Sequence, residues 1–250
     1  MKARKSMTNE TYQDEIFILK VKDWQTADKY VVCFSRDHGK VAFVAYGARY
    51  ARHNGGRLLQ PFAQLSVQLT SGKRLDTMRQ CEILVMPQTL DLETLAYGAV
   101  IAEVVETLTE EHEAQEEIYL LLLQTMELLG KHNKRLVTLS AICKVLALCG
   151  FAPILDECTG CHKRQLQDAF FSTVQGGLVC DACSTGVEIP FAVGTQELMQ
   201  KLMFLDFTQP EKFTVRGTEL MQLEQIIYKF IVYQTDKPLK SLNFLVQMGI

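Results

Sequence analysis

The chain has 250 residues, of which 48% are hydrophobic and 22% are charged, and its formal net charge is −3. This composition is ordinary for a globular protein with a real core, and the length allows one large domain or two to three small ones. A membrane-spanning helix is not expected, because the longest apolar run, 118–129, is interrupted by polar residues and falls short of the roughly eighteen residues needed. No secretory signal is recognisable at the N-terminus, where polar and acidic residues follow the first cations.

The net charge conceals a strong asymmetry along the chain. Residues 1–80 contain fourteen Lys and Arg against seven Asp and Glu, whereas the remaining residues contain twelve against twenty-two. Residues 91–130 contain ten carboxylates and no Lys or Arg. The split predicts a basic working surface on the N-terminal part and an acidic body behind it, with two ordinary solvated faces as the alternative.

The first 14 residues are polar and are expected to lie outside the fold. Five strand-like runs follow, separated by turn sequences that include the compact hairpin turn at 36–39. The runs cover residues 16–21, 29–35, 40–46, 62–70 and 75–85. Five short strands without a strong helix between them predict a small closed β-barrel, and the OB-fold matches best by size and strand count. We expect this domain to occupy residues 1–86.

Barrels of this type bind single-stranded nucleic acid along strands 2–3 and through the 1–2 and 4–5 loops. In this chain those places, together with the loop at 47–57, are rich in cations, and Tyr46 and Tyr50 lie beside them. The predicted phosphate-contacting residues are Lys29, Arg36, Lys40, Arg49, Arg52, Arg57, Lys73 and Arg74. Trp24, in the first loop, is either a stacking platform for bases or an anchor at the rim of the core.

After Pro87 the apolar residues recur at helical spacing. Helices are predicted over 90–108, 116–129 and 136–148, the last of which stops at Gly150. Two more are predicted over 195–205 and 220–233. The chain is therefore expected to be an α+β protein, with an α-helical domain over 87–250 that is interrupted at 156–187 by a separate module.

The interrupting module carries the most specific motif of the sequence. Cys158-Thr-Gly-Cys161 and Cys180-Asp-Ala-Cys183 are two Cys-x-x-Cys knuckles separated by eighteen residues. Each knuckle places two sulfurs on one side of a tight turn, and two knuckles close a tetrahedron around one structural Zn²⁺ ion. The strand-like runs between them predict a β-hairpin and hence a zinc ribbon. Eight cysteines are too few for a disulfide scaffold in a chain of this length, and His162 is expected to be an exposed neighbour of the site.

Motifs typical of catalysis are missing from the sequence. It contains no phosphate-binding Gly-x-x-x-x-Gly-Lys loop and no His-Glu-x-x-His motif. Four cysteines close a zinc site, whereas a catalytic zinc keeps an open position. His38 and His53 have no evident Ser or Cys partner, and the carboxylates of 91–130 have the spacing of a solvated helix face. The sequence favours binding over catalysis, and no catalytic residue is assigned.

Several short motifs, in their order along the chain, resemble the bacterial DNA-repair family RecO. They are Arg36-Asp37-His38-Gly39-Lys40, Gly47-Ala48-Arg49, the run from Arg57 to Phe62, Gly150-Phe151-Ala152-Pro153, the two cysteine knuckles with Gly176-Gly177-Leu178-Val179, and Pro238-Leu239-Lys240-Ser241. The resemblance covers nearly the whole chain from about residue 14. One departure concerns the stretch 23–28, which lacks the Tyr-Gly pair common in the family's first loop. The polar N-terminal extension has no counterpart that can be placed.

The resemblance implies an N-terminal OB-fold and an α-helical domain with the zinc module. It also implies binding of single- and double-stranded DNA, annealing of complementary strands, and loading of RecA onto gapped DNA coated with single-strand-binding protein, in complex with RecR. No nucleotide would be hydrolysed, and the protein would act in the bacterial cytoplasm at the nucleoid. Two alternatives remain open: a zinc-containing protein–protein adaptor with incidental DNA contact, and a nucleic-acid-modifying enzyme.

Overall fold

The computed structural model describes residues 10–50, 55–87, 90–164, 166, 168–206 and 215–248. The chain divides into two compact units, residues 1–130 and 131–250. The first unit therefore groups the barrel with the two helices that follow it. The predicted boundary at residue 86 and the predicted limits 156–187 of the zinc module stay predictions. Among the described helices, none is long and apolar enough to cross a membrane.

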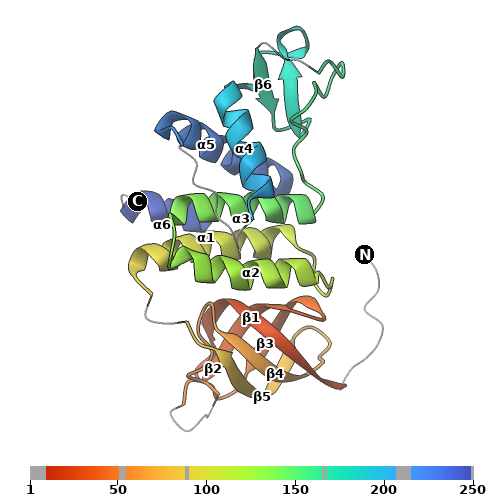
Figure 1. The fold of residues 1–250 in the computed structure, drawn as a ribbon. Coiled ribbons are helices and arrows are strands. Elements are labelled where there is room, and N and C mark those ends of the chain that lie inside the picture. Colours follow the sequence, from red (N-terminus) through yellow and green to blue (C-terminus); the bar gives the residue numbers. More distant parts are fainter. Residues whose placement is uncertain are drawn as a thin grey trace. The chain divides into compact units, whose positions relative to one another are not determined.

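The first unit contains the predicted five-stranded barrel, followed by two helices (Figure 1). The strands close in the order β1-β2-β3-β5-β4, with β4 returning to β1. All neighbouring strands are antiparallel except β3 and β5, which pair in parallel over a short stretch. The elements are β1 (Thr11–Trp24), β2 (Asp28–Ser35), β3 (Gly39–Ala45), β4 (Gln64–Thr70), β5 (Asp76–Val85), α1 (Leu92–Leu108) and α2 (Glu116–Leu129). The OB-fold prediction is confirmed.

The expectation that all of the first 14 residues lie outside the fold is wrong for the last four of them. The strand β1 begins at Thr11, because its first half pairs with β4 from Thr11 opposite Thr70 to Phe17 opposite Gln64. The second half pairs with β2. A bulge in the pairing with β2 falls between Ile18 and Lys20. At the bulge the backbone of Ile18 bonds instead to Phe62 and Ala63, so one long strand serves both sides of the barrel.

Two apolar layers hold the first unit together. Side chains such as Val31, Cys33 and Phe43 fill the barrel interior. The alternate residues on the outer face of β2 and β3 are also buried, since Val32, Phe34 and Val44 are no more than 5% exposed. A strand that is apolar on both faces needs a second layer to cover it. Lys40 on this face binds the end of α1, and α1 and α2 also contact the neighbouring strand β1, which indicates that these helices provide the cover (Figure 1).

Lysine side chains of the barrel bind the C-terminal half of α1. The Nζ of Lys40 donates to the carbonyl oxygens of Glu106, at 2.6 Å, and Thr109. The last turn of α1 has no basic residue of its own, so Lys40 places a positive charge at the negative end of the helix dipole. Lys20 on β1 forms an ion pair with Glu106 at 2.8 Å. The carboxylate of Asp91 caps the other end by accepting from the backbone N–H of Thr94.

The second unit consists of helices and a small sheet of three strands in the order β7-β6-β8. Its β6 and β7 form the predicted hairpin, and β8 adds a third strand that the sequence analysis did not predict. The elements are α3 (Lys134–Leu148), β6 (Ala169–Ser172), β7 (Gly177–Cys180), the short 3-10 helix η1 (Asp181–Cys183), β8 (Ile189–Phe191), α4 (Val193–Phe204), α5 (Gly217–Thr235) and α6 (Lys240–Met248). The apolar side chains of Phe171, Phe191 and Phe230 connect the sheet to α5.

The turn between β2 and β3 is fixed by a buried carboxylate and by a close backbone approach. Asp14 accepts hydrogen bonds from the hydroxyl of Ser35 and the backbone N–H of Asp37, and it lies 2.6 Å from the Nδ1 of His38. Gly39 follows with φ +67°, and a Cβ atom there would lie 1.9 Å from the carbonyl oxygen of Glu113. Only glycine allows the segment between α1 and α2 to approach this turn so closely.

We therefore expect Gly39→Ala to destabilise the chain strongly. The left-handed backbone alone costs about 1–2 kcal/mol for a residue with a Cβ atom, and the clash with Glu113 adds to that cost. Gly150→Ala is the matched control, because Gly150 also has a positive φ but has nothing within 4 Å of the added Cβ. Urea unfolding followed by circular dichroism measures both losses. Equal losses in the two variants would contradict the close approach.

Candidate metal centre and nucleic-acid interface

The structure brings the four predicted cysteines together. The sulfur atoms of Cys158, Cys161, Cys180 and Cys183 all lie within 4.8 Å of one another. The sulfurs of Cys161 and Cys180 are 3.7 Å apart. Zinc–sulfur bonds of about 2.3 Å in a tetrahedron separate the sulfurs by roughly 3.8 Å, so the cluster has the dimensions of a four-thiolate metal centre.

The backbone around the first knuckle is shaped to hold a thiolate. Burial alone raises the pKa of Cys158, but the backbone N–H groups of Cys180, Cys161 and Gly160 outweigh it and lower the pKa to about 6. Hydrogen bonds that the Cys183 thiol donates to the sulfurs of Cys180, Cys161 and Cys158 raise the pKa of Cys183 to about 12. A Cβ atom at Gly160 would lie 3.2 Å from the sulfur of Cys183, so this position needs a small residue. A cation bound between the four sulfurs would stabilise the thiolate form of each cysteine.

His162 lies beside the cluster, as predicted, and is turned away from it. Its side chain is 73% exposed, and its Nδ1 lies 2.8 Å from a carboxylate oxygen of Glu157. The hydrogen bond with His162 lowers the pKa of Glu157. The remaining cysteines behave as small apolar residues: Cys33 and Cys143 are fully buried, and burial raises the pKa of both thiols.

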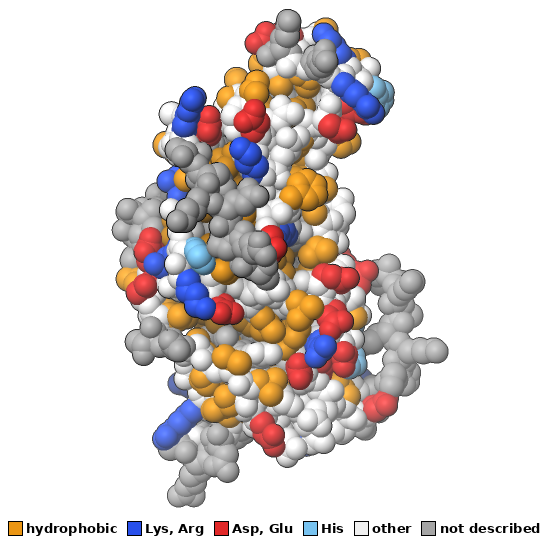
Figure 2. Space-filling view, viewed as in Figure 1, with side chains coloured by type: hydrophobic (Ala, Val, Ile, Leu, Met, Phe, Trp, Pro, Cys, Tyr) orange, Lys and Arg blue, Asp and Glu red, His pale blue; other side chains and the backbone are white. Residues whose placement is uncertain are grey.

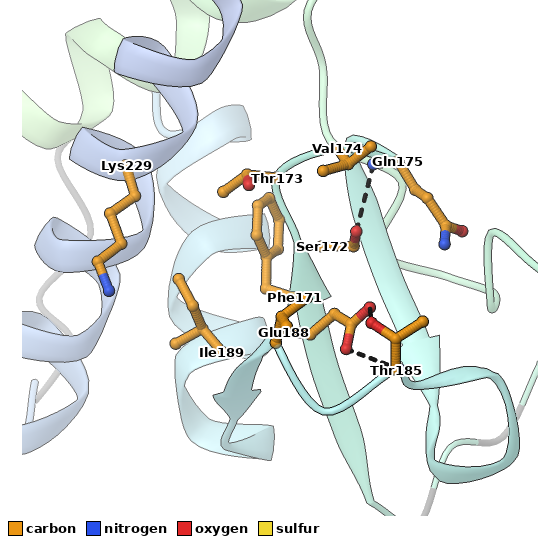
Figure 3. A pocket seen from close by; sticks show the side chains of 10 residues that line it. Phe171, Ser172, Thr173, Val174, Gln175, Thr185, Glu188, Ile189 and Lys229 are labelled. Atoms are coloured by element: carbon orange, nitrogen blue, oxygen red, sulfur yellow. Dashed lines mark hydrogen bonds between the residues drawn. The ribbon is translucent and has the colours of Figure 1, made fainter.

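The ribbon borders an open cleft of about 280 Å³ that is also lined by Lys229 of α5 (Figure 3). The carboxylate of Glu188 in its lining is occupied by the neighbouring loop, because it accepts hydrogen bonds from Ser184, Thr185 and Gly186. Burial raises the pKa of Glu188, but these bonds and that of its own N–H outweigh burial and lower the pKa to about 2. We therefore infer that the carboxylate of Glu188 stabilises the loop at 184–186 through these hydrogen bonds.

Ser35, His38 and Asp14 lie together on the barrel, but their arrangement is not that of a catalytic triad. The Ser35 hydroxyl and the His38 ring both face the same oxygen, Oδ2 of Asp14. A nucleophilic serine must instead give its proton to the imidazole, and its oxygen must reach a substrate. Ser35 is only 1% exposed. We therefore infer that the three residues have a structural role, in which they stabilise the turn between β2 and β3.

The predicted DNA-contacting cations fall into distinct environments. The ammonium groups of Lys29 and Lys40 are both bound to backbone carbonyls, that of Lys29 to Gly56 at 2.8 Å and Leu59 at 3.2 Å. Both ammonium groups therefore support the fold directly. The sequence could not indicate this role, because the carbonyls lie 27 to 69 residues further along the chain.

Two of the predicted arginines form ion pairs at the surface of the first unit. Arg36 contacts Glu116 at 2.7 Å and Glu15 at 3.4 Å. Arg49 contacts Asp23 at 3.4 Å and donates to the carbonyl oxygen of Thr26. Figure 2 shows blue and red side chains intermixed where the right-hand end of α2 meets the barrel. Glu116, the first residue of α2, together with Glu15 and Asp23 of β1, thus neutralises basic groups of the barrel.

The other predicted cations lie in the β3–β4 and β4–β5 loops. Arg57, Lys73 and Arg74 are exposed. Arg57 and Arg74 have no ion-pair partner among the residues that the structure describes, whereas Lys73 does have an interaction. Arg52 lies outside the described residues. Sequence analysis missed the pairing of Trp24 with Tyr30, whose ring centroids are 5.5 Å apart; the spacing across the short hairpin could have indicated it.

The chain thus has a closed OB-fold barrel with cations in its loops, and a separate cluster of four cysteines. These features define it as an OB-fold protein with a candidate metal centre. Comparison with known proteins narrows this class. Residues 7–86 match the family described as "Recombination protein O N terminal", and residues 89–243 match "Recombination protein O C terminal". The chain therefore belongs to the RecO family.

Individual relatives agree with the family match over nearly their whole length. The DNA repair protein RecO of Symbiobacterium thermophilum is 32% identical over 94% of this chain and 96% of its own. The protein of the same name from Pelotomaculum thermopropionicum is 30% identical over 95% of this chain and 94% of its own. The predicted resemblance is confirmed, and with it a role in DNA repair.

We expect Cys180→Ala to abolish metal retention, because three thiolates cannot close the tetrahedron. Plasma mass spectrometry after passage over a chelating resin should find about one equivalent of metal in the unchanged chain and almost none in the variant. Cys149→Ala is the matched control, since Cys149 lies outside the cluster. Full metal retention by Cys180→Ala would contradict the four-thiolate centre.

We expect Lys40→Met to destabilise the first unit, because the carbonyls at the end of α1 lose a charged donor while the aliphatic stem is kept. Hydrogen bonds to charged groups contribute about 1.5–3 kcal/mol. Urea unfolding followed by the fluorescence of Trp24, the chain's single tryptophan, reports on this unit. Lys22→Met, at an exposed position of the same sheet, should leave stability unchanged. Equal stability of Lys40→Met and the unchanged chain would refute this role.

Proposed function

We propose that the chain is a non-enzymatic mediator of DNA repair and recombination. It binds single- and double-stranded DNA, anneals complementary strands and, with RecR, helps to load RecA onto gapped DNA coated with single-strand-binding protein. Membership of the RecO family supports the DNA-repair role. The observation that carries the DNA contact is the set of exposed arginines in the loops of an OB-fold barrel. The site of action would be the bacterial cytoplasm, at the nucleoid.

Electrostatics supplies the mechanism of binding and annealing. Arginine and lysine side chains displace counterions from phosphates, which makes binding dependent on salt and nearly independent of sequence. Two strands bound to cations repel each other less, so complementary bases can meet and pair. Of the eight predicted cations, we assign the main contact to Arg49, Arg57 and Arg74, with Lys73 and Arg52 beside them in sequence. Lys29 and Lys40 contribute positive potential, and Arg36 contributes less because Glu15 and Glu116 oppose it.

We propose Zn²⁺ as the metal of the four-cysteine cluster. Four thiolates at tetrahedral spacing are the ligand set of structural zinc. The small apolar cluster of the ribbon consists largely of the cysteines themselves together with Val179 and Phe170. Such a segment has too little core to fold alone, so the metal would hold it together. Zinc therefore has a structural role in this proposal.

A second candidate function, a protein–protein adaptor, is favoured by one observation. The end of β5 exposes three consecutive apolar residues, Ile83, Leu84 and Val85. Contiguous exposed apolar surface often marks a partner site. In the mediator proposal this strand end is a candidate contact for RecR or single-strand-binding protein. Capture of a partner by a variant with no measurable DNA affinity would favour the adaptor instead.

We expect replacement of Arg49, Arg57 and Arg74 together with Gln to weaken oligonucleotide binding. The slope of log affinity against log salt concentration should decrease by about one for each phosphate contact removed. Fluorescence anisotropy with a labelled oligonucleotide between 50 and 200 mM salt measures both quantities. The matched control is Arg164→Gln, since Arg164 is 79% exposed and close to the cysteine knuckles.

The control also defines the contrary result. If Arg164→Gln lost affinity while the triple variant kept it, the DNA site would lie on the zinc ribbon. If the affinity of the unchanged chain did not vary with salt, phosphate contact would not be the basis of binding. Circular dichroism of each variant checks that the barrel is folded.

A further inference from the structure

The outer face of β2 and β3, where OB-folds commonly bind nucleic acid, is closed over most of its length. Phe34 is fully buried there, and Val32 and Val44 are almost so. Lys40, on the same face, is bound to the end of α1. A nucleic-acid strand therefore cannot lie along the middle of this face while α1 is in place.

The far end of the same face is open and aromatic. Trp24 is the last residue of β1 and lies opposite Asp28 of β2, while Tyr30, two residues further along β2, pairs with Val44 of β3. The rings of Trp24 and Tyr30 are 5.5 Å apart and tilted by 32°. Trp24 is nevertheless 41% exposed, so Tyr30 covers only part of its ring. Tyr46, which directly follows β3, is 59% exposed.

This end of the barrel is held in place before any ligand binds. The carboxylate of Asp28, which is buried, accepts from the backbone N–H of Gly47 at 2.8 Å. The backbone N–H of Arg49 donates to the carbonyl oxygen of Ala27 at 2.9 Å. The tip of the β1–β2 hairpin and the start of the β3–β4 loop are therefore joined by one side-chain and one backbone hydrogen bond. A ring on such a support loses little conformational freedom when it stacks on a ligand.

This end of the barrel carries charges of both signs. Burial and the negative charges of Glu111 and Glu106 raise the pKa of Tyr30, while Arg49 and Lys22 supply positive charge. The guanidinium of Arg49 lies at the hairpin tip, where it donates to the carbonyl oxygen of Thr26. It also pairs with Asp23, the exposed carboxylate next to Trp24, which reduces the repulsion that a phosphate would meet there. Lys22, two residues before Trp24 on the same strand, is exposed. Aromatic faces flanked by cations are the combination that binds single-stranded nucleic acid without reading its sequence.

We propose that Trp24, supported by Tyr30, stacks on an unpaired base, and that this end of the barrel selects single-stranded over double-stranded DNA. Bases inside a duplex are already stacked on one another and offer no free face to Trp24, whereas those of a single strand do. The inference rests on the proposed DNA-binding function and adds to it the residue that distinguishes the two forms of DNA. Tyr46 is placed to contact a neighbouring nucleotide.

The single tryptophan of the chain makes the test direct. Stacking on a base quenches indole fluorescence, so titration with oligothymidylate should quench Trp24 with the same dissociation constant that anisotropy of a labelled oligothymidylate gives. Trp24→Ala should weaken single-strand binding roughly tenfold, the loss expected for one stacked base, and should change the affinity for a duplex of equal length less than twofold. Trp24→Phe should restore most of the loss.

The controls separate failure of this inference from failure of the proposed function. Tyr233→Ala removes an aromatic ring of similar exposure, 51%, from the other unit and should have no effect. If anisotropy detects binding but Trp24 fluorescence stays unchanged, stacking is wrong and DNA binding stands. If Trp24→Ala lowers single-strand and duplex affinity equally, the selectivity is wrong. If anisotropy detects no binding even at low salt, the proposed function fails as well.

Discussion

The bond between Lys40 and the end of α1 decides which side of the barrel is accessible. Its ammonium group binds the carbonyl oxygens of Glu106 and Thr109, which carry the negative end of the helix dipole. The segment that follows α1 then approaches the barrel turn so closely that Gly39 has no room for a side chain. With α1 fixed in this way, the apolar outer face of β2 and β3 is buried as a second core. The first unit is therefore a barrel with one closed side.

The closed side also explains the charge asymmetry of the sequence. Two acidic residues of 91–130 lie against the barrel, because Glu106 pairs with Lys20 and Glu116 pairs with Arg36. These carboxylates neutralise basic groups of the barrel near the helices. Arg57 and Arg74, two exposed arginines without an ion-pair partner among the described residues, lie in the β3–β4 and β4–β5 loops, away from these pairs in the sequence. The part of the barrel that can attract phosphates is thus smaller than the distribution of Lys and Arg along the chain indicates.

Local patterns in the sequence predicted most elements of the fold, but not β8 or α6. Alternating apolar residues predicted the strands, helical spacing predicted the helices, and the knuckle spacing predicted that four sulfurs meet. The roles of individual cations could not be predicted in the same way. Lys29 and Lys40 look like any exposed lysine, and only the tertiary fold brings carbonyl oxygens to their ammonium groups. The early start of β1 was missed because the polar residues 11–14 pair with β4 through their backbone, which leaves no apolar pattern.

Photo-crosslinking tests most directly that DNA meets the open end of the barrel. A single-stranded oligonucleotide containing 5-iodouracil would be irradiated in complex with the chain, and the crosslinked residues would be located by mass spectrometry. Crosslinks at Trp24, Tyr46 or Tyr50, and none between Cys158 and Cys183, are the predicted result. Crosslinks confined to the cysteine ribbon or to the helices of the second unit would contradict it.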